Sequence, residues 1–210
     1  MNLIYDLEQG IRQLGISLDK DAQNKLMNYL SLLGKWNKVY NLTAIRDPRK
    51  MVIYHLLDSL AVVPYLWEGQ WLDVGCGAGL PGLVLAIARP DWQFTLLDSN
   101  SKKISFVQQS IIELQVFNVK VNCIRVEDWQ PANLFDGIVS RAYSELGDFI
   151  NNTIHLMAPQ GKWMAMKSAP QEELTKLPDS CCLENIITLQ VPYLHAPRSL
   201  VIARRAIQID

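Results

Sequence analysis

Hydrophobic residues recur along the start of the chain with the spacing of amphipathic helices. Leu3, Leu7, Ile11 and Leu14 lie three or four positions apart, a repeat that places their side chains on one helix face. A second helix is predicted after Asp19, because an aspartate carboxylate can cap the first helical turn. Its apolar face comprises Leu26, Tyr29, Leu30, Leu33 and Trp36.

Asp47 and Pro48 predict the start of a third helix, because aspartate is a good capping residue and proline fits the first helical position. The helical spacing continues through Met51, Tyr54, Leu57 and Leu60. We expect this helix to end near Pro64, which closes the helical first third of the chain.

From Gln70 onward, short apolar runs alternate with helical patterns. The runs predict strands at 71–74, 94–97, 119–126, 135–139 and 162–166, with helices at 83–88, 102–116 and 146–157. Strands separated by helices form a parallel sheet that is covered on both faces. Two further runs, at 185–191 and 200–203, predict an antiparallel pair at one edge of that sheet. The predicted fold class is therefore α/β and Rossmann-like.

The charges of the chain are nearly balanced, with a formal net charge of −1. A surface that coats nucleic acid on all sides is therefore not expected. Basic residues nevertheless cluster around a single acid, Asp47; they are Lys35, Lys38, Arg46, Arg49 and Lys50. One basic face can hold a phosphate backbone, while a solvated helix surface explains these charges equally well.

The composition argues against a membrane protein, a secreted protein and a zinc-stabilised protein. No apolar run reaches the roughly 20 residues of a membrane-spanning helix, and the opening MNLIYDLEQG lacks the layout of a secretion signal. We therefore expect a cytoplasmic location without membrane contact. The four cysteines are Cys76, Cys123, Cys181 and Cys182. They form no CxxC pair, which argues against a structural zinc site and favours free thiols.

The segment from Asp73 to Gly82, DVGCGAGLPG, is the most informative part of the sequence. It follows a predicted strand and opens a predicted helix, the context that a nucleotide-binding loop requires. Gly77, Gly79 and Gly82 match the dinucleotide pattern GxGxxG, but the strand ends at Val74, which makes Gly75 the first turn glycine. Asp73 suits a cationic amino acid group better than a pyrophosphate. We therefore favour S-adenosylmethionine over NAD as the cofactor.

Further polar residues follow the predicted strands where an adenosine would lie. Asp98, followed by Ser99, ends the second strand, where a carboxylate can accept both ribose hydroxyls of either cofactor. After the third strand, Glu127 or Asp128 could accept the exocyclic amine of adenine, and Val126 could supply an apolar wall. Ser140 and Arg141 end the fourth strand, at the expected position of the sulfonium group.

The fourth strand also bears on the methyl acceptor. It carries Ser140-Arg141-Ala142-Tyr143 in place of the Asn/Asp-Pro-Pro-aromatic segment common in enzymes that methylate exocyclic amines. No cysteine lies there to attack a pyrimidine C5. A ring nitrogen such as guanine N7 needs alignment with the methyl group and little acid–base help. The missing general base is consistent with N7 chemistry.

Two sets of motifs resemble a known family. WNKVYNLTAIR from Trp36 to Arg46 and HLLDSL from His55 to Leu60 resemble the N-terminal motifs of the ribosomal small-subunit guanine-N7 methyltransferase G family, also called glucose-inhibited division protein B. The same family is matched by the glycine loop and by segments at 96–99, 125–127 and 135–142. The resemblance runs from about Trp36 to Lys167, and a weaker resemblance is present at 191–192 and 198–201.

The resemblance implies methyl transfer to N7 of a guanine in the 530 loop of 16S rRNA, with the small ribosomal subunit as partner and no protein partner. It implies a class I methyltransferase fold with a mostly parallel seven-stranded sheet, divided into a helical extension, 1–68, and a methyltransferase domain, 69–210. The candidate cofactor-binding residues are Asp73, Gly75, Gly77, Gly79, Leu80, Asp98, Ser99, Val126, Glu127 and Arg141, with Arg141 also the catalytic candidate. The candidate RNA-binding residues are Asn41, Arg46, His55, Arg125, Lys167 and Arg198.

Other interpretations of the same residues stay open. His55 could simply hydrogen-bond to backbone, and Asn41 could have no role beyond capping the end of a helix. Lys167 could be a solvated residue at the end of its strand. The chain could methylate another RNA, a protein or a small molecule, or bind a nucleoside or RNA without turnover. A dehydrogenase is the remaining enzymatic alternative.

Overall fold

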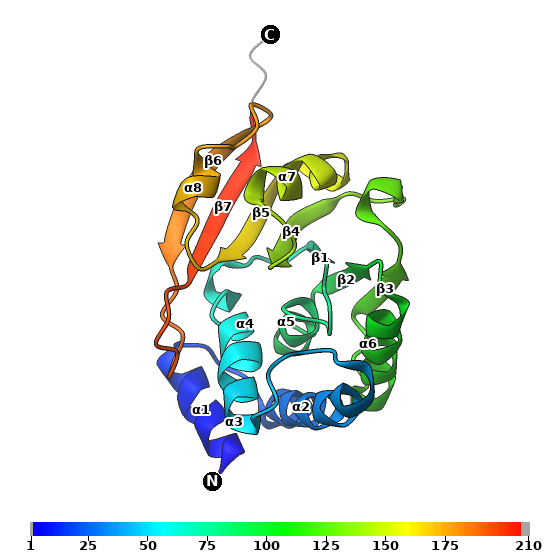
Figure 1. Cartoon of the computed structure of the whole chain (residues 1–210), viewed down its shortest axis with the longest axis vertical. Coiled ribbons are helices and arrows are strands. Elements are labelled where there is room, and N and C mark those ends of the chain that lie inside the picture. Colours follow the sequence, from blue (N-terminus) through cyan, green and yellow to red (C-terminus); the bar gives the residue numbers. More distant parts are fainter. Residues whose placement is uncertain (1, 207–210) are drawn as a thin grey trace.

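A seven-stranded sheet forms the centre of the computed structural model, which describes residues 2–206 (Figure 1). The strands are β1 (Gln70–Val74), β2 (Gln93–Asp98), β3 (Val119–Cys123), β4 (Phe135–Arg141), β5 (Met157–Lys167), β6 (Cys181–Thr188) and β7 (Ser199–Arg205). Their order is β3-β2-β1-β4-β5-β7-β6. Strands β1 to β5 run parallel, and β7 runs antiparallel to both β5 and β6. The predicted parallel sheet with an antiparallel edge pair is confirmed.

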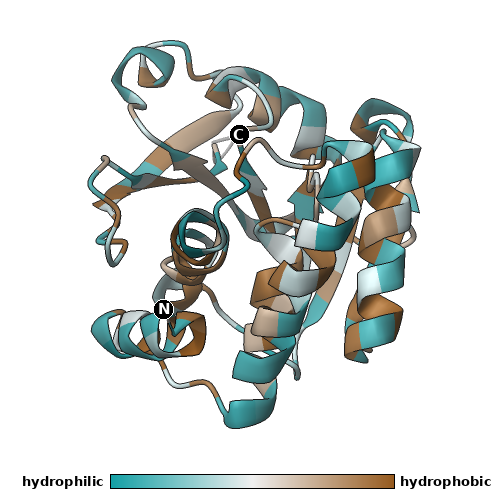
Figure 2. Cartoon of the chain, turned by 60° about the horizontal axis from the view of Figure 1, so that its bottom comes forward, coloured by the Kyte–Doolittle hydropathy of each residue, from teal (hydrophilic) through white to brown (hydrophobic). Residues whose placement is uncertain are grey.

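Alternate residues of each strand face two separate hydrophobic clusters, as the pleat of a sheet requires. Trp71 and Val139 belong to a cluster shared with α1 (Leu3–Gln13), α2 (Lys20–Tyr40), α5 (Gly82–Ala88) and α6 (Ser101–Leu114). Leu72 and Ile138 face the other cluster, which α7 (Leu146–Thr153) covers. Figure 2 shows hydrophilic residues along the outer sides of the helices. Among residues 2–206, no helix combines the length and the apolar composition needed to cross a bilayer.

The two N-terminal helices bury the faces that the sequence predicts. Leu7 and Ile11 of α1 and Leu26 and Leu33 of α2 are buried, in the same cluster as the helix that follows the glycine loop. Tyr29 Oη donates a hydrogen bond of 2.8 Å to the carbonyl of Ala78 in that loop. Helix α2 therefore packs directly on the glycine loop, and the division at residues 68 and 69 stays a prediction.

The third predicted helix is not uniform. Asp47 caps it through a hydrogen bond of 2.8 Å from Lys50 N–H, and Pro48 begins it, as predicted. After α3 (Pro48–Met51), however, residues Val52–Leu57 form a π-helix, η1, and α4 (Asp58–Leu60) completes the segment. The wider π turn rotates the side chains that follow it, and such turns frequently occur at functional sites. Hydrophobic spacing alone did not reveal this change.

Several predicted element ends were wrong. The third strand ends at Cys123 rather than residue 126, because Val126–Asp128 turn into a short 3-10 helix, η3. The helix predicted to reach residue 157 ends at Thr153, followed by η4 (Ile154–Leu156), and β5 begins at Met157 by pairing with β4. Likewise β6 begins at Cys181 through pairing with β7. The short helix α8 (Gln171–Leu174) was not predicted.

Gly137 in β4 is expected to be essential for the packing of the sheet. A Cβ atom built there would lie 2.4 Å from Trp71 Cζ3. The Trp71 ring cannot move away readily, because it is fully buried and its Nε1 donates to the Trp67 carbonyl. We expect Gly137→Ala to lower the free energy of unfolding by about 2 kcal/mol, measured by urea titration. Gly34→Ala, where a Cβ meets nothing within 4 Å in the middle of α2, is the control. Equal unfolding midpoints for Gly137→Ala and the wild-type protein would contradict this packing argument.

Candidate cofactor and acceptor site

The glycine loop adopts a backbone that most residues avoid. Gly75, Gly77 and Gly79 have φ angles of +68°, +57° and +87°, a left-handed region that glycine enters at little cost. The N–H of Gly75 donates to the Leu97 carbonyl at 2.8 Å, which joins the loop to β2. A Cβ at Gly75 would lie 2.6 Å from Tyr143 Cδ2, whereas nothing lies within 4 Å of one at Gly77. Gly77 therefore leaves its backbone open to a ligand.

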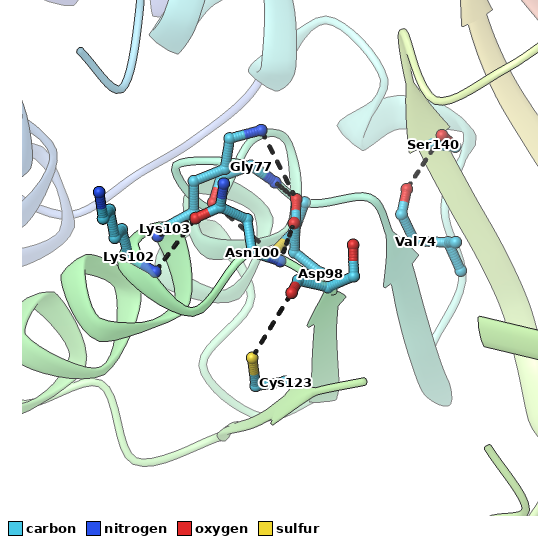
Figure 3. A network of polar contacts seen from close by, with 10 residues as sticks. Val74, Gly77, Asp98, Asn100, Lys102, Lys103, Cys123 and Ser140 are labelled. Atoms are coloured by element: carbon cyan, nitrogen blue, oxygen red, sulfur yellow. Dashed lines mark hydrogen bonds and ion pairs between the residues drawn. The ribbon is translucent and has the colours of Figure 1, made fainter. Parts of the chain in front are cut away.

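Asp98, at the end of β2, holds the loop from the other side (Figure 3). Its Oδ2 accepts the N–H of Gly77 at 2.9 Å, and its Oδ1 accepts the N–H of Asn100 at 2.8 Å. Lys103 Nζ lies 3.9 Å from Oδ2. These contacts hold the Asp98 side chain at the carboxyl end of the sheet, where further lone pairs of its oxygens remain for a ligand.

A hollow of about 250 Å³ opens beside Asp98, and we call it the glycine-loop hollow. Its lining comprises Gly75, Leu97, Asp98, Ser99, Lys103, Ile124, Arg125, Val126, Glu127, Ala142 and Tyr143. The structure thus brings together five predicted cofactor residues: Gly75, Asp98, Ser99, Val126 and Glu127. Arg125, a predicted RNA residue, lines the same hollow. The other predicted cofactor residues, Asp73, Gly77, Gly79, Leu80 and Arg141, lie outside this lining.

Asp73 is fully buried beneath the loop. Its Oδ2 accepts the N–H of Gly82 at 2.7 Å, at the start of α5, and its Oδ1 has no hydrogen-bond partner within residues 2–206. Desolvation raises the pKa of Asp73 to about 7, although the Gly82 hydrogen bond opposes the shift. In this structure Asp73 closes the loop onto α5, and its predicted contact with the amino acid portion of a cofactor stays a prediction.

A second hollow, of about 370 Å³, adjoins the first and is called the arginine hollow. Its lining comprises Ile45, Tyr54, His55, Asp58, Arg141, Ala142, Met166, Lys167, Ser168 and Arg198. Ala142 lines both hollows and has a left-handed φ of +58°. Four predicted site residues therefore meet here from separate parts of the chain: His55, Arg141, Lys167 and Arg198.

A buried carboxylate connects the two arginines of this hollow. Arg141 Nη1 donates to Asp58 Oδ2 at 3.0 Å and to the Tyr54 carbonyl at 2.9 Å. Arg198 Nε donates to Asp58 Oδ1 at 3.0 Å. The side chain of Asp58 is only 3% exposed. Asp58 is not among the residues predicted from the sequence, although an acid within the apolar run from Met51 to Leu60 is a visible signal.

The remaining predicted RNA residues differ in their surroundings. Lys167 Nζ lies 2.6 Å from Glu173 Oε2 and 2.6 Å from the Ser144 carbonyl, which compensates its charge. Asn41 ends α2 in a left-handed conformation, and its Oδ1 accepts Arg46 Nη2 at 3.0 Å. Asn41 and Arg46 are exposed and lie outside both hollows.

His55 is buried in the wall of the arginine hollow. Its Nε2 lies 3.1 Å from Thr43 Oγ1, and Asn37 holds Thr43 through two backbone hydrogen bonds. Burial lowers the pKa of His55 to about 4, and the nearby Arg141 charge adds to the shift. His55 is therefore neutral at pH 7, and it packs in the hollow as a fixed polar side chain.

The lowered pKa of His55 predicts a pH-dependent stability. The unfolded chain takes up the histidine proton near pH 6.5, while the folded chain resists it until about pH 4. Stabilisation from neutral His55 is therefore present above pH 6.5 and lost as pH falls through 4, a change of about 3 kcal/mol. In urea titrations, the stability difference between wild type and His55→Gln should shrink by about that amount from pH 7 to pH 4. The raised pKa of Asp73 makes its own contribution to stability increase as pH falls, but this contribution is the same in both proteins and cancels in the difference. A constant difference would contradict the prediction.

The fold is that of the class I methyltransferases. The structure is similar to the N-methyltransferase NodS from Bradyrhizobium japonicum WM9 in complex with S-adenosyl-L-homocysteine, with a TM-score of 0.58, 17% identity and coverage of 85% of this chain and 98% of that chain. A SAM-dependent methyltransferase from Aquifex aeolicus gives a TM-score of 0.57, 19% identity and coverage of 80% and 96%. At these identities the likeness shows the fold alone.

Sequence comparison identifies the family. Residues 22–202 match the family model described as rRNA small subunit methyltransferase G. Proteins named ribosomal RNA small subunit methyltransferase G are 48% identical in Laribacter hongkongensis, covering 96% of this chain and 98% of the relative, and 53% identical in Methylobacillus flagellatus, covering 93% and 95%. The relative from Pseudomonas aeruginosa PAO1 is 51% identical over 95% of this chain and 94% of its own length. The chain belongs to the rRNA small subunit methyltransferase G family.

Proposed function

We propose that this chain transfers a methyl group from S-adenosylmethionine to N7 of a guanine in the 530 loop of 16S rRNA, in the cytoplasm. The observation that carries the proposal is the pair of hollows that share Ala142, one suited to a nucleoside cofactor and one lined by arginines. Membership of the family supports ribosomal RNA as the substrate class. The N7 atom and the 530 loop follow from the motif resemblance.

The residues of the glycine-loop hollow fit S-adenosylmethionine. Asp98 would accept hydrogen bonds from the ribose hydroxyls, and Glu127 would accept the exocyclic amine of adenine. Val126, which is buried, would form an apolar wall of the hollow. When bound, the cofactor supplies a methyl group on a positively charged sulfur. Oδ1 of Asp73, which has no hydrogen-bond partner among residues 2–206, lies beneath the same loop.

The arginine hollow suits an acceptor that has no proton to lose. Guanine N7 carries a lone pair, so its methylation needs orientation rather than a general base. Asp58 is held by two arginines, and the low pKa of His55 keeps that ring neutral. Arg141 directly precedes Ala142, the residue between the hollows, and would orient the base against the methyl group. Its role is therefore catalytic.

The RNA backbone would lie against basic residues near the hollow. Arg198 lines it directly, while Arg46 and Asn41 are exposed beyond the end of α2. Lysine and arginine contacts to phosphates release counterions, so the affinity for RNA should fall steeply with added salt. The charge of Lys167 is already paired with Glu173, so Lys167 would contribute less to this term than Arg46 or Arg198.

The proposal is tested by incubating the protein with labelled S-adenosylmethionine and either 30S subunits or naked 16S rRNA. Nuclease digestion and mass spectrometry then locate the label, and calorimetry compares S-adenosylhomocysteine with NAD. We expect one 7-methylguanosine in the 530 loop and no binding of NAD. Label in another nucleotide would refute the proposed target, and bound cofactor without transfer to either substrate would refute the enzymatic function.

A further inference from the structure

The side chain of Asp58 joins three segments around the arginine hollow. It follows the π-helix η1, and its own N–H bonds to the Ile53 carbonyl five residues back, so the wide turn ends at Asp58 itself. One carboxylate oxygen accepts Arg141, from the end of β4, and the other accepts Arg198, from the loop before β7. These contacts span 83 and 140 positions along the chain.

Each arginine keeps N–H groups that the protein does not use. Within residues 2–206, Arg141 bonds only through Nη1, and Arg198 bonds through Nε and Nη1. The remaining guanidinium nitrogens can donate to oxygen or nitrogen acceptors of a ligand. One buried carboxylate between two guanidinium groups also leaves a net positive charge, which suits the electron-rich edge of a nucleotide.

We propose that Asp58 is a positioning residue for methyl transfer, which fixes Arg141 and Arg198 so that their free N–H groups form a preformed binding surface for the acceptor nucleotide. This inference rests on the proposed function. A carboxylate is required because each of its two oxygens accepts one arginine. An asparagine amide offers one acceptor and turns its NH2 group toward the other guanidinium, so it can hold one arginine at most.

The test is the single-turnover rate of methyl transfer to 30S subunits at saturating S-adenosylmethionine. Releasing one arginine should misplace the acceptor, so we expect Asp58→Asn to slow transfer about 30-fold. Its affinity for S-adenosylhomocysteine should stay within about threefold of wild type, because Asp58 is outside the glycine-loop hollow. Asp91→Asn, an exposed carboxylate in the turn before β2, is the matched control and should react at the wild-type rate.

Two further variants separate positioning from a contribution to folding. Asp58→Glu keeps the buried charge but displaces it, so transfer should be about fivefold slower with cofactor affinity unchanged. If Asp58 acts through Arg198, the fold-loss of transfer rate in the double variant Asp58→Asn/Arg198→Gln should be smaller than the product of the fold-losses in Asp58→Asn and Arg198→Gln measured singly. If Asp58→Asn fails to bind S-adenosylhomocysteine, its fold is disrupted, and the transfer rate of Asp58→Glu tests the positioning role instead.

Wild-type rates in Asp58→Asn or Asp58→Glu, or fully multiplicative losses in the double variant, would overturn the inference. They would leave the proposed function intact, because the wild-type enzyme would still be active. A wild-type protein that methylates no ribosomal RNA would instead refute the proposed function. The two failures are therefore distinguishable in one set of assays.

Discussion

Asp98→Asn is expected to weaken the binding of S-adenosylhomocysteine by about 100-fold, because two hydrogen bonds to a carboxylate are together worth about 3 kcal/mol. The neutral amide would lack the charged carboxylate oxygens that accept hydrogen bonds from the two ribose hydroxyls. It also turns an NH2 group toward the N–H of Gly77 or Asn100, both of which donate to Asp98. Isothermal titration calorimetry of the purified protein measures the affinity directly.

Asp91→Asn controls for the loss of one negative charge, since Asp91 is exposed and lies outside both hollows. The circular dichroism spectrum and the unfolding midpoint of Asp98→Asn show whether the glycine loop stays folded. An affinity within threefold of wild type in a folded Asp98→Asn protein would mean that the nucleoside binds elsewhere. The proposed cofactor site would then be wrong.

Arg141→Gln is expected to slow single-turnover methyl transfer by about 300-fold, because a donor next to the reacting atoms contributes to alignment and charge stabilisation. Arg198 still pairs with Asp58 in this variant, which preserves part of the buried network. The affinity for S-adenosylhomocysteine should change little, since Arg141 lines the arginine hollow rather than the glycine-loop hollow. Rates are measured by rapid quench with labelled cofactor and 30S subunits.

Arg12→Gln provides the matched control, because Arg12 is an exposed arginine of α1 outside both hollows. It should transfer methyl groups at the wild-type rate. If Arg141→Gln loses cofactor affinity and transfer in equal measure, Arg141 serves the cofactor, as the sequence analysis also allowed. If both stay at wild-type values, Arg141 has no catalytic role.

Asp98 and Arg141 are both candidate residues from the sequence, but the folded chain groups the candidates differently from their predicted roles. Arg141 was assigned both to catalysis and to the cofactor, and it lies with Asp58 and Tyr54 in the arginine hollow. Arg125 was assigned to RNA and lies beside the glycine loop. Position at the end of a strand predicts which edge of the sheet a residue occupies. It does not predict which of two neighbouring hollows the side chain enters.

Residue spacing predicts the order of the seven strands and of the main helices, the capping of the third helix by Asp47, and the glycine loop between β1 and α5, but not the short helix α8. These features depend on spacing and on interactions between residues close in the chain, which a pattern records. Two contacts emerge only in the folded chain: Asp58 joins Arg141 to Arg198, and Tyr143 packs over Gly75. Those contacts form only after the sheet brings distant segments together, so no local pattern contains them.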